Sequence, residues 1–409
     1  MGKPKIRFKG YNDEWEQRKL GDIAEFSKGS GYSKGDLIES GTPIILYGRL
    51  YTKYETSISE VDTYVEAKDG SVYSKGGEVI VPASGETAED IARAATVDKS
   101  GVILGGDLNV VSPNEDINSA FLAISISHGN SQRELAKKAQ GKSVVHIHNE
   151  EIKNLVVPFP AKAEQNKIVE YFSNIDDLIT LHQRKCDEMK TLKKYMLQKM
   201  FPQNGQKIPE IRFEGFTGEW EQRKLGDIAS SFEYGLNAAA KEYDGENKYI
   251  RITDIDDNTH EFLTDNLTSP DIALTGADNY KLTEGDILFA RTGASVGKSY
   301  IYRNSDGLVY YAGFLIRARI KEEYDAEFVF QNTLTDRYNK YIFVTSQRSG
   351  QPGVNAQEYA EFEVKVPKKE EQTKIGAYFR NLDRLITLHQ RKCDKLKSIK
   401  KFMLQNMFV

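Results

Sequence analysis

The feature that most constrains the fold of this chain is a long helical segment that occurs twice. The ten residues LITLHQRKCD run over Leu178–Asp187 and again over Leu385–Asp394. The match extends over Glu164–Phe201 and Glu371–Phe408, and a second matching pair, IRFKGYNDEWEQRKLGDIA and IRFEGFTGEWEQRKLGDIA, opens the two halves. A repeat unit of about 205 residues is much longer than a solenoid repeat. The chain is therefore a tandem duplication of a whole domain.

Both copies of the helical segment carry an apolar seam with the period of a coiled coil. Apolar residues, joined by one His and one Cys, recur at alternating steps of four and three. One alternative is that each helix lies on the core of its own domain, but a seam this long and narrow is better buried against another helix. We therefore expect the two copies to pack antiparallel. The predicted interface residues are Ile175, Ile179, His182, Cys186, Leu382, Ile386, His389 and Cys393.

The repeats and local composition predict the domain organisation. We expect a first globular domain over residues 1–163, a central helix over 164–201, a Pro- and Gly-containing linker over 202–210, a second globular domain over 211–370 and a final helix over 371–409. Runs such as EVIVPAS and VYYAGFLIRARI predict strands, whereas SAFLAISISH and EFVFQNTLTDRYNKYIF predict helices. The predicted fold class is α+β, with two tandem mixed α/β domains, each followed by a long helix.

Composition excludes several classes of protein. The 409 residues are 39% hydrophobic and 28% charged, as is typical of folded globular domains. No apolar run approaches the roughly 20 residues that a membrane-spanning helix needs, and the first residues do not form a signal peptide. Two cysteines do not make a disulfide framework, so we expect a cytoplasmic protein with no membrane partner. A net charge of −4 argues neither for nor against nucleic acid.

No catalytic motif stands out in either half. The segment GASVGKS at 293–299 follows a predicted strand, but its glycines are too close together for a phosphate-binding loop. The sequence also lacks a Gly-rich dinucleotide fingerprint, a Cys-x-x-Cys pair, a His-Glu-x-x-His motif and the Asn-Pro-Pro-aromatic stretch of adenine methyltransferases. We therefore expect no catalytic residues and no cofactor on this chain.

The paired His and Cys residues of the helices have two interpretations. His182 with Cys186, and His389 with Cys393, share one helix face because each pair is spaced four residues apart. Antiparallel packing would bring His182 near His389, and two His with two Cys form a known zinc ligand set. The plainer interpretation, which we favour, is that these are seam residues, with His fixing the register and Cys filling space. We expect no metal.

Polar loops in both halves carry candidate nucleic-acid contacts. Arg, Lys, Gln and Asn on exposed loops are the side chains that contact phosphates and base edges, although such loops are also ordinary protein surface. In the second domain the candidates are Arg291, Lys298, Arg348 and Gln351, on the segments ARTGASVGKS and SQRSGQPGVN. In the first domain they are Lys138, Lys142, His146 and His148, on KKAQGKSVVHIH, together with the weaker candidate Arg49.

The order of these parts resembles the specificity subunit of type I restriction-modification enzymes, over essentially the whole chain. W-x-x-x-x-LGDI opens each half, at Trp15–Ile23 and Trp220–Ile228, and GD-I-L-x-x-R-x-G follows at Gly285–Gly293. Next come a predicted strand ending in Pro and the residues EQ-x-K-I, which lead into the LITLHQRK helix. The first half departs from this pattern, because it has Pro82-Ala83-Ser84 where the second has Ala290-Arg291-Thr292.

The resemblance implies a DNA-binding subunit with no catalytic activity of its own. In that family, each half is a target recognition domain that reads one part of a two-part site on double-stranded DNA, and two antiparallel helices set the spacing. Two modification subunits, which carry S-adenosylmethionine and methylate adenine, bind the specificity subunit, and restriction subunits join them. The residues alone leave two other functions open, namely a protein-binding structural adaptor and a nuclease or methyltransferase with an unrecognised site.

Overall fold

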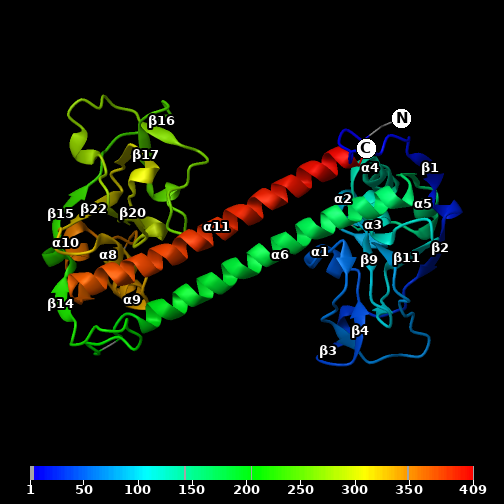
Figure 1. The fold of residues 1–409 in the computed structure, drawn as a ribbon, viewed down its shortest axis with the longest axis horizontal. Coiled ribbons are helices and arrows are strands. Elements are labelled where there is room, and N and C mark those ends of the chain that lie inside the picture. The colour runs from blue at the N-terminus through cyan, green and yellow to red at the C-terminus, as the bar shows by residue number, and fades with distance from the viewer. Residues whose placement is uncertain (1–3, 142–143, 204, 348–349, 409) are drawn as a thin grey trace. The chain divides into compact units, whose positions relative to one another are not determined.

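The chain folds into two compact units, and the computed structural model describes residues 4–141, 144–203, 205–347 and 350–408. One unit consists of residues 1–181 and 393–409, and the other of residues 182–392 (Figure 1). The long helices α6 (Lys162–Lys199) and α11 (Lys369–Met407) each contribute to both units. Both helices begin and end two residues earlier than the sequence predicted.

The first unit is built on a five-stranded sheet. Its central strand β7 (Glu78–Pro82) is buried along its whole length, which explains its continuous run of apolar residues. The pairings are antiparallel except at the edge strand β5, which pairs in parallel with β9. The strand order is β2 (Ala24–Lys28), β11 (Leu108–Pro113), β7, β9 (Ala95–Val97) and β5 (Ser57–Ile58).

Short helices and smaller sheets complete the first unit. The apolar helix α3 (Ser119–Ser127), predicted from its sequence, is buried from Phe121 onward and packs against β7 and β9. The other helices are α1 (Arg49–Thr52), α2 (Ala88–Ile91), α4 (Gly129–Lys138) and α5 (Asn149–Lys153). The remaining strands are β10 (Ile103–Leu104), β4 (Thr42–Ile45), β6 (Tyr64–Val65) and β3 (Leu37–Ile38) in one sheet, β1 (Glu16–Lys19) with β13 (Val156–Phe159), and β8 (Ser84–Gly85) with β12 (Val145–His146).

The second unit has a four-stranded antiparallel sheet. Its order is β15 (Ala229–Tyr234), β22 (Leu315–Ile320), β19 (Ile287–Ala290) and β20 (Ser299–Ile301). Two-stranded pairs join β14 (Glu221–Lys224) with β23 (Glu363–Val366), β16 (Ala240–Glu242) with β18 (Thr268–Pro270), and β17 (Lys248–Ile250) with β21 (Val309–Tyr311). The helices are α7 (Leu225–Ile228), α8 (Ala326–Asn332), α9 (Asp336–Thr345) and α10 (Ala356–Ala360).

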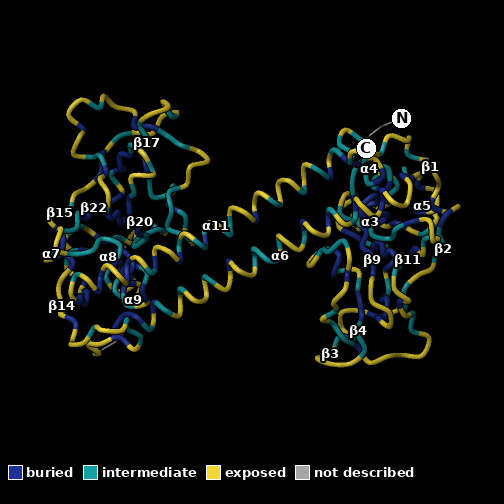
Figure 2. Tube along the Cα trace, in the orientation of Figure 1, coloured by how far each residue is buried: buried dark blue, intermediate teal, exposed yellow. Residues whose placement is uncertain are grey.

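Within each unit, α6 and α11 run antiparallel and bury the predicted seam. In the second unit, Nδ1 of His182 lies 2.9 Å from Nδ1 of His389, and Cys186 is fully buried beside the backbone of Ile386. In the first unit, Lys400 forms an ion pair with Asp176, and Phe172 packs on Phe408. Figure 2 shows exposed residues alternating with less exposed ones along both helices. The interface residues Ile175, Leu382, Ile386 and Cys393 are buried, and Ile179 is half-buried.

The C-terminal end of each helix is held in a cluster of aromatic rings. Phe408 packs against Trp15 and Phe121 in the first unit. In the second unit, Phe201 occupies the corresponding place against Trp220 and Phe328. Because each cluster includes the Trp that opens one half and the end of the helix that closes the other, the core of each domain is completed by the helix of the other copy.

The matching segments that open each half are structural. The side chain of Arg7 donates two hydrogen bonds of 2.7 Å to the buried carboxylate of Glu164, and Arg212 does the same to Glu371. Each of these pairs fastens an opening segment to the first turns of a long helix. The repeated IRF and EQ motifs are therefore explained by the scaffold alone.

Candidate nucleic-acid interface

In the second domain, one candidate loop is held against a neighbouring segment by backbone hydrogen bonds. The loop follows β19 and begins at Arg291, whose carbonyl accepts from the N–H of Val354 at 2.9 Å. The N–H of Gly293 donates to the carbonyl of Pro352 at 3.0 Å. Gly293 has a φ of 73°, and a Cβ there would lie 3.1 Å from the side chain of Gln351. The structure therefore places two predicted contacts, Arg291 and the exposed Gln351, on adjoining segments.

Arg291 lies among aromatic rings that the sequence analysis did not single out. The carbon atom of its guanidinium lies 5.0 Å from the ring centre of Tyr234 and 6.0 Å from that of Phe314. Both rings are exposed, Tyr234 by 43% and Phe314 by 58%. Sequence alone gave little signal for this cluster, because Phe314 lay inside a run predicted as strand and Tyr234 is far away in the chain. The Gly313-Phe314 turn, which separates β21 from β22, was the only local sign.

The charge on Arg291 is unpaired, unlike that of the other arginines between residues 205 and 347. Among the described residues, it has neither an ion pair nor a side-chain hydrogen bond. Its guanidinium donors are thus available to a ligand. The other arginines of this range all pair with carboxylates: Arg212 with Glu371, Arg223 with Glu221, Arg251 with Asp254, Arg303 with Glu327, Arg317 with Glu233, Arg319 with Asp286 and Arg337 with Glu363.

Lys298, which we expected to contact a phosphate, is turned toward the protein. Its ammonium donates to the carbonyl of Ile255 at 3.0 Å and forms an ion pair of 2.5 Å with Asp257. Only 10% of its side chain is exposed. In this structure the ammonium anchors the loop that contains Ile255 and Asp257, and its phosphate contact stays a prediction.

The first domain builds a loop of the same design with different side chains. The N–H of Ile147 donates to the carbonyl of Ala83 at 3.1 Å, as Val354 does to Arg291 in the second domain. The exposed rings of His146 and His148 are stacked, with an interplanar angle of 7°. Nδ1 of His146 lies 3.2 Å from the hydroxyl of Ser84. Both predicted His residues therefore lie on the exposed edge of this loop.

The other candidates of the first domain are placed differently. Arg49, the weaker candidate, is only 9% exposed, and its guanidinium pairs with Glu55 and Asp62, so its DNA contact stays a prediction. Those acids come after it in the sequence, and only the fold brings them onto one guanidinium. Lys138 is half-buried, with its ammonium 3.4 Å from the carbonyl of Glu151. Lys142 and Arg348 lie outside the described residues.

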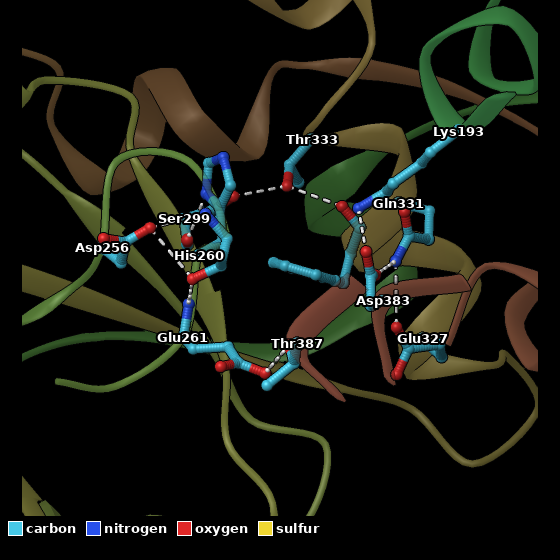
Figure 3. A network of polar contacts seen from close by, with 12 residues as sticks. Lys193, Asp256, His260, Glu261, Ser299, Glu327, Gln331, Thr333, Asp383 and Thr387 are labelled. Atoms are coloured by element: carbon cyan, nitrogen blue, oxygen red, sulfur yellow. Dashed lines mark hydrogen bonds and ion pairs between the residues drawn. The ribbon is translucent and has the colours of Figure 1, made fainter. Parts of the chain in front are cut away.

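A polar network ties the second domain to both long helices (Figure 3). Lys193 of α6 forms an ion pair of 2.6 Å with Asp383 of α11, and Gln331 of α8 donates to the same carboxylate at 3.0 Å. The hydroxyl of Thr387 donates to Glu261 at 2.7 Å. These contacts fix the helix pair against the domain in this unit.

His260 stabilises the loop that reaches these helices. Its backbone is left-handed, with a φ of 57°, and its Nδ1 lies 2.9 Å from the carbonyl of Ser299. Burial lowers the pKa of the imidazole, so the ring is neutral at neutral pH and donates to that carbonyl through Nδ1. We assign His260 and its neighbours a structural role.

The paired histidines of the helix seam behave as seam residues. Their Nδ1 atoms are close enough for one neutral ring to donate to the other, and burial followed by the proximity of His182 lowers the pKa of His389. Across the described parts of the chain, no group of three or more His, Cys, Asp or Glu side chains is placed to hold a metal. A search of the same residues found no helix long and apolar enough to span a membrane.

Comparison with known proteins identifies the domain that is duplicated. The family model described as "Type I restriction modification DNA specificity domain" matches the chain twice, over residues 12–191 and 217–398. The type I restriction enzyme MjaVIII specificity subunit of Methanocaldococcus jannaschii is 19% identical over 95% of this chain and 91% of its own length. A putative MjaX specificity subunit from the same organism is 26% identical over 53% of this chain and 52% of its own length.

Solved structures show the same fold over the whole chain. The S subunit of a type I restriction-modification system from M. genitalium aligns over 100% of this chain and 99% of its own, with a TM-score of 0.64 and 16% identity. A chain from a study of type I restriction-modification complex assembly aligns over 97% of this chain and 98% of its own, with a TM-score of 0.51 and 15% identity. The predicted fold class is confirmed. With two specificity domains that together span most of its length, the chain belongs to the type I restriction modification DNA specificity family.

Proposed function

We propose that the two domains of this chain read the two parts of one DNA site, and that the chain directs adenine methylation and restriction by partner subunits without catalysing either reaction. S-adenosylmethionine would be carried by two modification subunits, and restriction subunits would join the complex. The chain would act in the cytoplasm, on double-stranded DNA.

The observation that carries this proposal is that the two copies share their buried scaffold contacts but differ in the side chains of their exposed loops. The nearly identical segments make the same buried contacts in both units, such as Arg7 with Glu164 and Arg212 with Glu371. The equivalent exposed loops carry unlike side chains, His146 and His148 in one unit and Arg291 with Gln351 in the other. A duplicated enzyme would be expected to keep its reactive groups in both copies. A common scaffold with two different exposed loops suits the reading of two different sequences.

The helices also support two equivalent docking surfaces for modification subunits. Leu192 and Tyr195 on α6 are 38% and 48% exposed, and their counterparts on α11, Ile399 and Phe402, are 37% and 56% exposed. Each pair is spaced three residues apart, so its side chains share one face of a helix. One such apolar pair occurs in each unit, as expected if two copies of the same partner bind.

The proposal is tested by mapping methylated adenines in cells with and without the gene. We expect a two-part motif that is methylated only when the gene is present. If the methylated motifs are the same in both strains, the chain does not direct methylation, and a protein-binding adaptor becomes the better description. Methylation or cleavage of DNA by the purified chain alone would instead show that it is an enzyme.

A further inference from the structure

The cluster of the half-buried Arg291 with the exposed rings of Tyr234 and Phe314 carries an inference about base identity, which rests on the proposed function. We propose that Arg291 reads a guanine in the part of the site that the second domain recognises. In this proposal, Tyr234 and Phe314 are positioning residues, which hold the guanidinium in the orientation that a guanine requires.

The first argument is that Arg291 is available to a ligand. The chain has more acidic than basic residues, 60 against 56, and each of the other arginines between residues 205 and 347 forms an ion pair with a carboxylate. Ring faces surround Arg291 instead, and a ring attracts a cation without using its N–H donors. The guanidinium therefore keeps the paired donors that match O6 and N7 of guanine in the major groove.

The second argument is that the cluster is rigid. The backbone N–H of Arg291 donates to the carbonyl of Phe314 at 3.1 Å, and its own carbonyl accepts from Val354. The hydroxyl of Tyr234 accepts from the N–H of Ala356 at 3.2 Å. Three segments of the domain are thus bonded to one another around this one side chain. A bidentate contact with a base edge needs fixed orientation, whereas a phosphate contact mainly needs charge. The two rings that hold the guanidinium therefore favour a contact with a base edge over a contact with a phosphate.

The third argument is that the equivalent place in the first domain has none of these features. There the N–H of Ala83 donates to the carbonyl of Asp107 at 2.7 Å, as Arg291 does to Phe314. Lys28, which pairs with Asn109, stands where Tyr234 pairs with Ile316. Neither an Arg nor an aromatic ring is present at these positions. The guanine contact is therefore specific to the second domain, and the first half of the motif serves as an internal control.

The experiment maps the methylated motif in cells that carry the complete system with single substitutions. For Arg291→Ala we expect one guanine position in one half of the motif to lose about five- to 150-fold of its discrimination, while the other half is unchanged. Phe314→Ala should reduce the discrimination at the same position by less than Arg291→Ala does. Phe314→Trp keeps an aromatic ring and should retain the discrimination. Tyr234→Phe keeps the ring and should retain the motif, whereas Tyr234→Leu should blur the same position as Phe314→Ala does.

The outcomes separate this inference from the proposed function. An unchanged motif in Arg291→Ala would overturn the guanine contact and leave the two-part reading intact. Equal weakening at all sites, with DNA binding by the purified complex that is less sensitive to salt, would mean that Arg291 contacts a phosphate and would also overturn the proposal. A variant that fails to fold would lose the whole motif, and Arg291→Lys then supplies the test, because Lys keeps the charge but not the planar guanidinium. Loss of guanine discrimination in Arg291→Lys supports the inference, and full retention overturns it.

Discussion

At the scale of single residues, equivalent positions of the two copies hold side chains of opposite character. Asp107 and Phe314 both accept the hydrogen bond from the first residue of the equivalent loop, yet one side chain is a carboxylate and the other an aromatic ring. The backbone bond is kept because the loop must be held in place. The side chain can differ because it is exposed in both copies and is not part of either core.

His128 should make the first unit less stable in mild acid. Burial, reinforced by the nearby charges of Lys400 and Arg93, lowers the pKa of its imidazole from 6.5 to about 4. The unfolded chain therefore takes up a proton at a higher pH than the folded chain. Stability is complete above pH 6.5 and falls as the pH drops toward 4, by about 1–2 kcal/mol at pH 5.

The measurement is the melting temperature at pH 7 and pH 5, in the native protein and in His128→Gln. The variant should lose less stability on acidification, because it has no imidazole to protonate at this position. An equally steep loss in both proteins would contradict the assignment and would point to the other histidines.

The sequence allowed side-chain contacts to be predicted where helical periodicity determines which residues meet. The contact between His182 and His389 could be expected, because a heptad seam fixes which residues of two antiparallel helices meet. The environments of Arg49 and Arg291 could not, since loops have no period that relates distant segments. Arg49 is covered by acids of its own loop region, and the half-buried Arg291 lies beside a ring from the strand β15 and a ring from the turn before β22.

At the scale of elements, both the apolar seam and the aromatic residues at the C-terminal ends determine how the two helices pack. A seam of small and apolar residues such as Cys186 and Ile386 allows close packing. The aromatic ends, Phe201 and Phe408, fix the register, because each must reach the core of the domain that the other copy opens. The long helices were the best predicted elements, and the two-residue strands β8 and β12 the least, because no periodic pattern fits so short a strand.

A charge in the seam should destabilise the protein strongly. Ile386 is 6% exposed, so Ile386→Asp would bury an unpaired carboxylate and remove apolar packing, at a cost of about 3–5 kcal/mol. We expect the same direction of effect, but a smaller one, for the half-buried Ile179→Asp. Leu388→Asp is the matched control, since Leu388 lies on the same helix and is 44% exposed. Thermal melting of the three variants tests this, and equal melting temperatures for Ile386→Asp and Leu388→Asp would refute a buried seam.

At the scale of the whole molecule, duplication gives one chain two equivalent sets of surfaces. The scaffold contacts and the apolar pairs on α6 and α11 occur once in each unit, so a partner that recognises one set recognises the other. The two halves differ in the material between these shared segments, including the sheets and the exposed loops. The proposed assembly is a single specificity chain with two identical partners.

The number of bound modification subunits should therefore follow the number of intact apolar pairs. The double change Leu192→Asp with Tyr195→Asp should reduce two bound subunits to one, and so should Ile399→Asp with Phe402→Asp. All four changes together should abolish binding, while Arg291→Ala should keep both partners. The mass of the purified complex gives the stoichiometry directly. Two bound subunits in every variant would place the docking surface elsewhere.

If the two domains read DNA independently, as proposed, an exchange of one domain should change only one half of the site. Residues of about 25–160 would be replaced by the equivalent segment of another specificity subunit with a known motif, leaving the repeated scaffold segments in place. Methylated adenines would then be mapped across the genome of cells that carry the chimaera. We expect a motif in which one half changes to that of the donor and the other half stays as it was. A motif whose two halves both change, or one that does not change at all, would contradict independent reading by the two domains.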